Sequence, residues 1–304
     1  MQNLKTKLTI SLLTLSLVVG CSQTPDVEVS TANTSSNTAE VTETNPSETA
    51  TANKIVALTS LSADIIHRLD ESKLVGIPGS RLLAQNPAFS ELPKVSEGRT
   101  PPSIEKIVAL KPDLVIGAVG FHDQILEKLT ALGIETIAAE VPNWQALEDL
   151  TTNIAEKIDA DPTALLAEYA AFLPENPTET EATLVLVSNQ PIMAPNRDSW
   201  AGDLLEQFAI NNLVAELQGN SPQQGYITLS PEKILEANPE ILILVDVGDD
   251  SIEQLQAAPF WGDLNAVKNE RVYTFDYYGL VNPGGIDAIQ VAAEQLQNIT
   301  AAVN

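Results

Sequence analysis

The sequence contains little of the chemistry that catalytic and metal sites commonly use. Among its 304 residues there are one cysteine and two histidines. A single cysteine excludes an internal disulfide, and the two histidines, His67 and His122, do not form a pair at the spacing of metal ligands. The sequence has no GxSxG nucleophile motif and no glycine-rich phosphate loop. We therefore predict a protein that is not an enzyme, has no cofactor and binds no metal directly.

Basic residues are also scarce. Against 41 aspartates and glutamates stand 16 lysines and arginines, which gives a formal net charge of −25. Nucleic acid binding requires clustered lysines and arginines, so we expect no nucleic-acid partner. Such acidity favours solubility and reduces association, which is consistent with a monomer; a specific cation-binding role is the alternative interpretation. Against this background, arginines in loops are conspicuous.

The chain lacks the run of about 20 apolar residues that a membrane-spanning helix requires. Its N-terminus has two lysines, an apolar run over residues 8–19, and then Gly20 and Cys21. This pattern predicts an export signal. The end of the signal, LVVGC, is similar to the lipobox of bacterial lipoproteins, which implies that Cys21 is lipidated and anchors the protein to a membrane of the cell envelope, in the periplasmic or extracytoplasmic space. An ordinary cleaved signal with an incidental cysteine is the alternative.

Residues 22–53 consist largely of Thr, Ser, Asn, Glu and Ala, with almost no large apolar side chain. A segment of this composition cannot bury enough apolar surface to offset its conformational entropy. We therefore expect a disordered, acidic tether between the anchor and a folded part that begins near Lys54.

A repeat is the most informative feature of the folded part. SIEKIVALKPDLVIG, from Ser103 to Gly117, recurs as SPEKILEANPEILIL from Ser230 to Leu244. Each copy predicts a helix capped by its serine and ended by a proline, followed by a strand that is apolar throughout and hence covered on both faces. Two related lobes would leave a cleft at the carboxyl ends of their strands, where ligands of open α/β sheets bind.

Apolar runs that alternate with helical patterns predict a parallel sheet in each lobe. The expected strands are 54–59, 73–77, 113–118 and 135–139 in the first lobe, and 182–188, 240–246 and 271–276 in the second. Helical patterns dominate from Trp144 to Leu173, with a break near Asp161 and Pro162, and later helices begin near Trp200, Pro231, Pro259 and Gly285. The predicted segments are a signal peptide (1–20), the lipidated cysteine with its tether (21–53), an N-terminal lobe (54–145), a helical connector (146–180) and a C-terminal lobe (181–304).

Together with the repeat and the lipobox, the stretches KIVALTSLSADIIHRL and RDSWAGDLLEQFAINNL carry a family resemblance. The chain resembles the ABC-transporter substrate-binding proteins of the class that serves ferric siderophores, haem and cobalamin. The resemblance implies an α/β fold of two Rossmann-like lobes with central parallel sheets, joined by a helix, with the ligand cleft between them. It also implies that the cleft closes only slightly on its ligand and that an ABC permease is the partner.

Glu105 and Glu232 occupy equivalent places in the two copies of the repeat. A carboxylate in the first helical turn interacts favourably with the helix dipole, which is a purely structural explanation. In the family that the chain resembles, one such glutamate on each lobe docks into arginine pockets of the permease, and these two positions match that motif.

For the ligand we consider residues that follow the expected strands or lie in nearby loops. Guanidinium groups neutralise and hydrogen-bond an anionic chelate, and aromatic rings cover its organic rim. The candidates are Ser60, Arg81, Arg99, Phe121, Arg197, Trp200, Tyr226, Tyr277 and Tyr278. The alternative interpretation of each loop arginine is a solvated surface charge, and the alternative for Trp200 is a core residue. If the segment of Tyr277 and Tyr278 is extended, only one of the two faces the cleft.

Direct ligation of a metal by a histidine is the weaker interpretation. His67 lies within a predicted helix, where a packed or solvent-facing histidine is expected, whereas His122 follows a strand and could ligate haem iron opposite a tyrosine. Any metal should otherwise arrive already chelated.

These observations predict a binding protein of an ABC importer that captures a ferric siderophore or ferric citrate. The alternatives are a corrinoid or haem as the ligand, an envelope protein of the same fold without a transport role, and an enzyme on the same scaffold.

Overall fold

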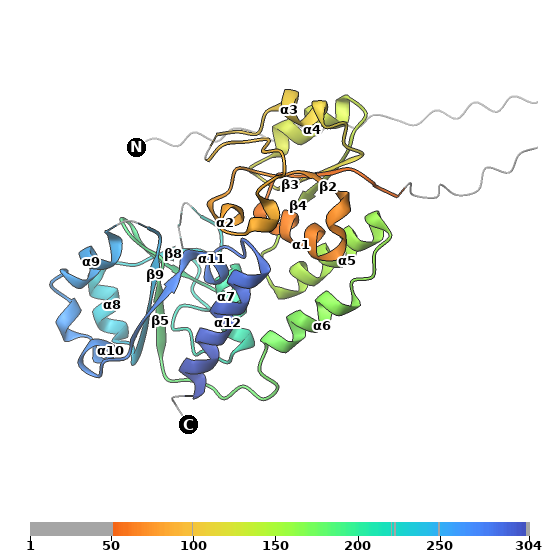
Figure 1. Cartoon of the computed structure of the whole chain (residues 1–304). Coiled ribbons are helices and arrows are strands. Elements are labelled where there is room, and N and C mark those ends of the chain that lie inside the picture. Colours follow the sequence, from red (N-terminus) through yellow and green to blue (C-terminus); the bar gives the residue numbers. More distant parts are fainter. Residues whose placement is uncertain (1–50, 99, 220, 222, 249, 302–304) are drawn as a thin grey trace, which may run out of the picture. The chain divides into compact units, whose positions relative to one another are not determined.

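The computed structural model describes residues 51–98, 100–219, 221, 223–248 and 250–301, all of which belong to one compact unit (Figure 1). Cys21, the signal and most of the predicted tether lie outside the described residues. Among the described residues, no helix combines the length and the apolarity needed to cross a bilayer.

The first half of the fold is built on a four-stranded parallel sheet in the order β2-β1-β3-β4. Its strands are β1 (Ile55–Ala57), β2 (Leu74–Gly76), β3 (Leu114–Ala118) and β4 (Glu135–Ala139). Its helices are α1 (Ser60–Asp70), α2 (Arg81–Ala84), α3 (Ile104–Ala109) and α4 (Asp123–Ala131), with short 3₁₀ turns η1 (Glu71–Lys73) and η2 (Pro87–Phe89). The four strands predicted for the N-terminal lobe are all present.

The second half contains a three-stranded parallel sheet in the order β10-β9-β5. The strands are β5 (Thr183–Leu186), β9 (Ile241–Asp246) and β10 (Val272–Asp276). Its helices are α7 (Trp200–Gln207), α8 (Pro231–Ala237), α9 (Ser251–Gln256), α10 (Asn265–Lys268), α11 (Tyr277–Leu280) and α12 (Ile286–Ala301), with η3 (Trp261–Asp263) before α10. Where one helix was predicted to begin near Pro259, the chain instead forms η3 and the short α10.

A small antiparallel sheet beside this one was not predicted. It pairs β6 (Ser188–Asn189), β7 (Ile192–Pro195) and β8 (Tyr226–Thr228). The expected strand 182–188 ends at Leu186, and its last residue belongs to β6 instead. These strands are too short to show a clear periodicity in sequence.

The two halves are connected by the helices α5 (Trp144–Ile158) and α6 (Thr163–Phe172). The predicted break between them is present, because Asp159 adopts a left-handed conformation (φ 57°) and ends α5. The side chain of Asn143 caps α5 by accepting a hydrogen bond from the N–H of Ala146 (2.8 Å).

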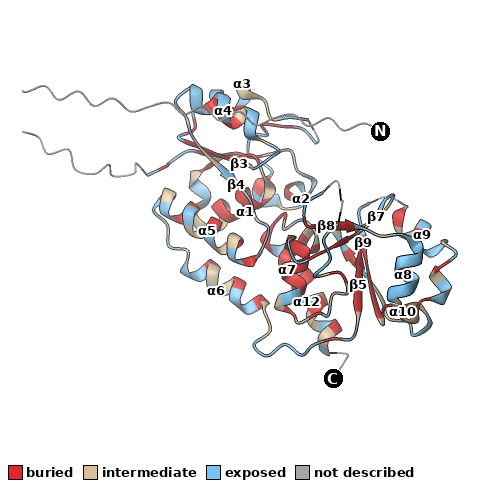
Figure 2. Ribbon diagram, turned by 180° about the vertical axis from the view of Figure 1, so that it is seen from behind, coloured by how far each residue is buried: buried red, intermediate tan, exposed pale blue. Residues whose placement is uncertain are grey.

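Both copies of the repeat form the predicted helix and strand. Ser103 and Ser230 cap α3 and α8, each accepting a hydrogen bond from the backbone N–H three residues later (3.3 and 3.4 Å). Alternate side chains of β3 and β9 then point to opposite faces of their sheets. Ile116 and Ile243 pack in one central core, whereas Val115 and Leu242 pack under the outer helices. Both faces of each strand are therefore buried, as the continuous apolar runs predict (Figure 2).

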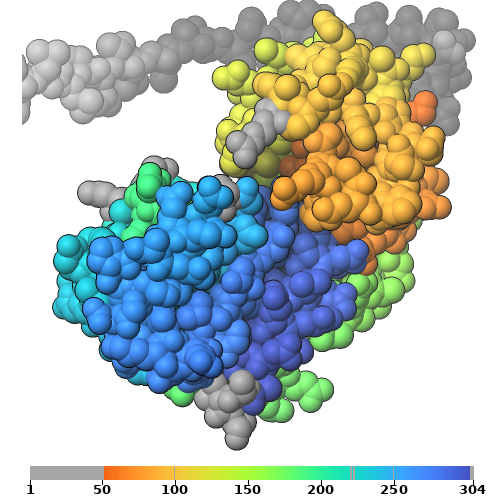
Figure 3. Space-filling model, turned by 60° about the vertical axis from the view of Figure 1, so that its left-hand side comes forward, coloured from red at the N-terminus to blue at the C-terminus, as the bar shows by residue number. Residues whose placement is uncertain are grey.

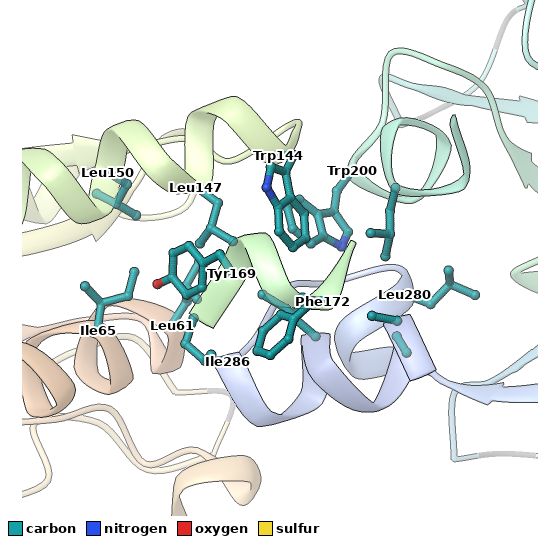
Figure 4. Close-up of a cluster of buried hydrophobic side chains, with 14 of the residues drawn as sticks. Leu61, Ile65, Trp144, Leu147, Leu150, Tyr169, Phe172, Trp200, Leu280 and Ile286 are labelled. Atoms are coloured by element: carbon teal, nitrogen blue, oxygen red, sulfur yellow. The ribbon is translucent and has the colours of Figure 1, made fainter. Parts of the chain in front are cut away.

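The central core extends from one sheet to the other through the connecting helices. Figure 4 shows side chains from α1, α5, α6, α7 and α12 in one cluster, among them Leu61, Trp144, Tyr169, Trp200 and Ile286. Trp144 stacks on Trp200, with ring centroids 6.0 Å apart. Because one continuous apolar core is shared, the two halves cannot separate without exposing it to water.

Candidate ligand-binding site

The carboxyl ends of strands from both halves meet around α2. The chain leaves β2 and enters α2 at Arg81, where the hydroxyl of Ser80 accepts a hydrogen bond from the N–H of Leu82 (3.2 Å). On the other side, β10 ends at Asp276, whose carboxylate accepts a hydrogen bond from the N–H of Tyr278 (2.7 Å). These two local caps fix the backbone from which Arg81 and Tyr278 project.

A pocket of about 190 Å³ lies between these two segments. It is lined by Arg81, Leu82, Gln85, Asp276, Tyr278, Ala288 and Val291. A second hollow of about 300 Å³ shares Leu82, Gln85 and Ala288 with it and continues toward Asp64 and Phe89. Both are open to solvent between α2 and the start of α12, and Figure 3 shows the orange segment lying against the blue C-terminal part of the chain. This is the candidate ligand-binding site.

Glycines lie beside both Tyr278 and Arg81. A Cβ atom on Gly284 would lie 2.6 Å from Cδ1 of Tyr278, so a larger residue would displace that ring. Gly248, which follows β9, has φ +81°, and a Cβ placed there would lie 4.0 Å from a guanidinium nitrogen of Arg81. Arg81 therefore reaches the loop after β9 as well as the pocket.

Phe121 and two valines add apolar surface at the same ends of the sheets. Phe121 follows β3, and its side chain is 88% exposed, so no packing in this structure accounts for it. Val119 and Val247 follow β3 and β9, and both are exposed. Each valine precedes a glycine of positive φ, Gly120 or Gly248. Sequence analysis missed the valines, although this second Val-Gly repeat could have revealed them.

Tyr277 and Tyr278 begin the short α11 rather than a loop, although Tyr278 keeps an extended backbone conformation (φ −76°, ψ 137°). Their rings make an edge-to-face contact, with centroids 5.4 Å apart. Tyr278 lines the pocket, whereas Tyr277 packs against the central core. Ser60 is not in a loop either: it is the half-buried first residue of α1, which Thr59 caps.

The structure places Trp200 and Tyr226 in the core. Trp200 is buried, and its indole N–H donates to the carbonyl of Gly279 (2.8 Å). Tyr226 is buried in β8, where loss of solvation, followed by the neighbouring Tyr277, raises the pKa of its phenol well above the ordinary value. Both rings pack in the central core, and neither residue lines the two hollows.

The other two candidate arginines do not join Arg81 at the pocket. The guanidinium of Arg197 forms an ion pair with Glu216, and Arg197 does not line either of the two hollows. Arg99 lies outside the described residues.

His122 is held in a way that argues against iron ligation. Its Nδ1 accepts a hydrogen bond from the backbone N–H of Ala118 (2.9 Å), so the neutral ring carries its proton on Nε2 and has no free nitrogen. Burial lowers the pKa of His122, and Asp123 opposes this shift only in part. His67 packs in α1 against Phe89, with ring centroids 4.9 Å apart. No cluster of three or more His, Cys, Asp or Glu side chains suited to a metal ion occurs in the part of the chain that the structure describes.

Glu105 and Glu232 are exposed in the first turns of α3 and α8. A hydrogen bond from the hydroxyl of Ser230, followed by the backbone N–H of Glu232 itself, lowers the pKa of Glu232. That carboxylate is therefore ionised at neutral pH.

Comparison with known proteins identifies the family. The family described as "Periplasmic binding protein" matches residues 55–278. The chain belongs to this family. This match and the similar proteins named below confirm the resemblance that the repeat and the two flanking stretches predict.

Three similar proteins differ in what their names say they bind. The Fe(3+)-citrate-binding protein YfmC of Bacillus subtilis (strain 168) is 23% identical over 305 residues, which cover 95% of this chain and 94% of YfmC. The Vitamin B12-binding protein of Salmonella paratyphi A is 27% identical over 210 residues, which cover 66% of this chain and 74% of that protein. A crystal structure of an ABC transporter substrate-binding protein from Listeria monocytogenes EGD-e has a TM-score of 0.65 at 20% identity and covers 82% of this chain and 98% of its own. This last similarity shows that the predicted two-lobed α/β fold is correct.

Proposed function

We propose that this family member is the substrate-binding protein of an ABC importer and that it captures a ferric siderophore or ferric citrate. The observation that carries the proposal is the pocket lined by Arg81 from one half of the fold and by Asp276 and Tyr278 from the other. A ligand in this position contacts both halves at once. On this proposal the ligand is bound and released chemically unchanged.

Two residues at the pocket suit an anionic chelate with an organic rim, although the carboxylate of Asp276 also lines it. The guanidinium of Arg81 supplies charge and fixed hydrogen-bond donors, while the ring of Tyr278 covers apolar atoms. Phe121 and the two exposed valines, Val119 and Val247, add apolar surface at the strand ends. The similarity to a protein named for Fe(3+)-citrate binding supports the same ligand class.

A corrinoid is the second candidate ligand, because relatives named for vitamin B12 binding match two thirds of the chain. Arg81 favours a negatively charged chelate over neutral cobalamin. Haem held by His122 is disfavoured, since Nδ1 of that ring already accepts a hydrogen bond from Ala118. An envelope protein of this fold without a transport role is the remaining alternative.

The partner of a binding protein of this kind is an ABC permease. We propose that Glu105 and Glu232 dock on it, because both carboxylates are exposed at equivalent places in the two halves. The protein acts outside the cytoplasm as a monomer. The similarity of LVVGC to a lipobox supports a lipid anchor at Cys21.

Isothermal titration calorimetry of the purified chain tests the ligand. The panel comprises ferric citrate, a ferric catecholate, a ferric hydroxamate, haem and cobalamin, with the metal-free chelators as controls. We expect saturable binding at about micromolar affinity or tighter for one ferric chelate. Binding of cobalamin alone would replace the iron assignment, and no binding to any compound would favour the role without transport. Mass spectrometry of the recovered ligand checks that it is chemically unchanged.

A further inference from the structure

The pocket between α2 and the end of β10 has opposite charges on its two sides. Arg81 lines it from α2, and Asp276 lines it from the last position of β10. Both residues are exposed. Within the part of the chain that the structure describes, neither takes part in an ion pair, whether with the other or with a third side chain. Both charges therefore remain available to a ligand.

The carboxylates of the larger hollow differ from Asp276 in this respect. Asp64 and Asp287 line that hollow, and Arg68 pairs with both of them. Their negative charge is therefore compensated within the chain. Of the three aspartates that line the two hollows, Asp276 is the one without a basic partner among the described residues.

The fold does not require a charge at Asp276. Its carboxylate accepts a hydrogen bond from the N–H of Tyr278 (2.7 Å), and the side-chain oxygen of an asparagine would serve as well. The residue paired with Asp276 in register on β9 is Asp246, which accepts from the N–H of Gly248 in the same way (2.7 Å). Like charges on directly paired residues of neighbouring strands are destabilising. A cation bound beside Asp276 would offset this repulsion.

The rest of the pocket wall is largely aliphatic. Leu82 contributes to it from α2, and Ala288 and Val291 contribute from α12. Val291 is 53% exposed, so its side chain is available to cover apolar atoms of a ligand. A ligand that fits this wall has methylene groups between its charged parts.

We propose that Asp276 selects a ferric hydroxamate chelate that has aliphatic spacers and ends in a primary ammonium group. This inference rests on the proposed function and narrows its ligand class. Hydroxamate oxygens carry local negative charge for Arg81, the ammonium pairs with Asp276, and the spacers contact the aliphatic wall. The hydroxamate groups cancel the charge of the ferric ion. Such a chelate therefore avoids the repulsion from Asp276 that the net negative charge of ferric citrate or a ferric catecholate would cause.

Calorimetry of the purified protein with two matched chelates tests the role of Asp276. One is a linear ferric trihydroxamate that ends in a primary amine, and the other is its N-acetyl derivative, which lacks only that charge. We expect the amine form to bind about five-fold tighter at low ionic strength, and salt to reduce this preference. Asp276→Asn should remove the preference and leave the affinity for the N-acetyl form unchanged.

Asp161→Asn is the matched control. The carboxylate of Asp161 also accepts from the N–H two residues later, that of Thr163 (2.9 Å), but Asp161 lines neither hollow. This variant should keep the preference for the amine form. Circular dichroism checks that both variants are folded.

The outcomes separate this inference from the function on which it rests. Equal affinity of the unaltered protein for the two chelates, or a preference that persists in Asp276→Asn, would overturn the role of Asp276 and leave the proposed function standing. Binding of ferric citrate without binding of either hydroxamate would have the same meaning. Absence of binding to these two chelates and to every other ferric chelate of the panel would overturn the proposed function as well.

Discussion

The carboxylate of Asp64, on α1, accepts a hydrogen bond from the backbone N–H of Ile286, the first residue of α12, at 2.7 Å. The other oxygen of Asp64 accepts from Nε of Arg68 (3.0 Å), and Arg68 also pairs with Glu168 of α6 and Asp287 of α12. One buried carboxylate thereby links helices from both halves of the fold, directly beside the larger hollow of the candidate site. A negative charge at the start of α12 also interacts favourably with the helix dipole.

Replacing Asp64 with alanine should destabilise the protein by about 2 to 3 kcal/mol, because a charged hydrogen bond and a helix cap are lost together. Asp64→Asn retains an acceptor for Ile286 but loses the ion pair with Arg68, so we expect a loss of about 1 kcal/mol. Urea unfolding followed by circular dichroism measures both. Equal losses of unfolding free energy in the two variants would show that the hydrogen bond to Ile286 contributes nothing beyond the charge of Asp64.

The stacked pair Trp144 and Trp200 gives a second prediction, because their indole N–H groups differ. Trp200 donates to Gly279, whereas the N–H of Trp144 is buried without a partner among the described residues. Trp200→Phe leaves the Gly279 carbonyl without its indole donor, while Trp144→Phe removes a donor that has no partner among the described residues. We expect Trp200→Phe to be more destabilising by about 1 to 3 kcal/mol. Urea unfolding of the two single variants tests this, and a larger loss in Trp144→Phe would contradict it.

Much of the fold could be predicted because local signals agree with the tertiary structure. Ser103 and Ser230 begin helices, and Pro112 and Pro239 follow the ends of these helices. The continuous apolar run after each proline forms a strand that is covered on both faces. The repeat supplies this information twice. Where the strands are short, as in β6 and β8, the sequence carries no comparable signal.

The site was less predictable, because it depends on contacts between distant segments. Trp200 and Tyr226 follow loops and have the right chemistry, yet tertiary packing turns both rings into the core. The approach of Arg81 to Gly248 depends on how the two halves meet, which no local pattern encodes. Sequence analysis could name the residue types at the strand ends but not the direction of each side chain.

The histidine content allows a direct test of the loop after β3. Because Nδ1 of His122 accepts from Ala118 and burial disfavours the charged ring, the pKa of His122 should lie below its ordinary value of 6.5. A folded-state pKa below the unfolded-state value contributes stability that is fully present above pH 6.5 and is lost as the pH falls through the folded-state pKa. NMR titration of the imidazole signals measures this pKa, with His67→Gln to assign the two histidines. A midpoint above 6.5 for His122 would contradict the acceptor role of Nδ1.

The last prediction concerns which arginine binds the chelate. Arg81 lines the pocket, whereas Arg197 pairs with Glu216. Arg81→Gln should weaken binding of the ferric chelate by about 10- to 100-fold, since a charge-assisted contact is lost. Arg81→Lys keeps the charge but not the planar pair of donors and should give an intermediate affinity.

Arg197→Gln is the matched control for this experiment, and calorimetry with the chelate identified from the panel measures all three variants. The control should change affinity by less than a factor of about two, because Arg197 is an exposed residue paired within its own half of the fold. A loss confined to Arg197→Gln would move the binding site away from α2 and toward the loop between β7 and α7. A loss confined to the Arg81 variants places the anionic part of the ligand between α2 and the end of β10, where both halves of the fold contact it.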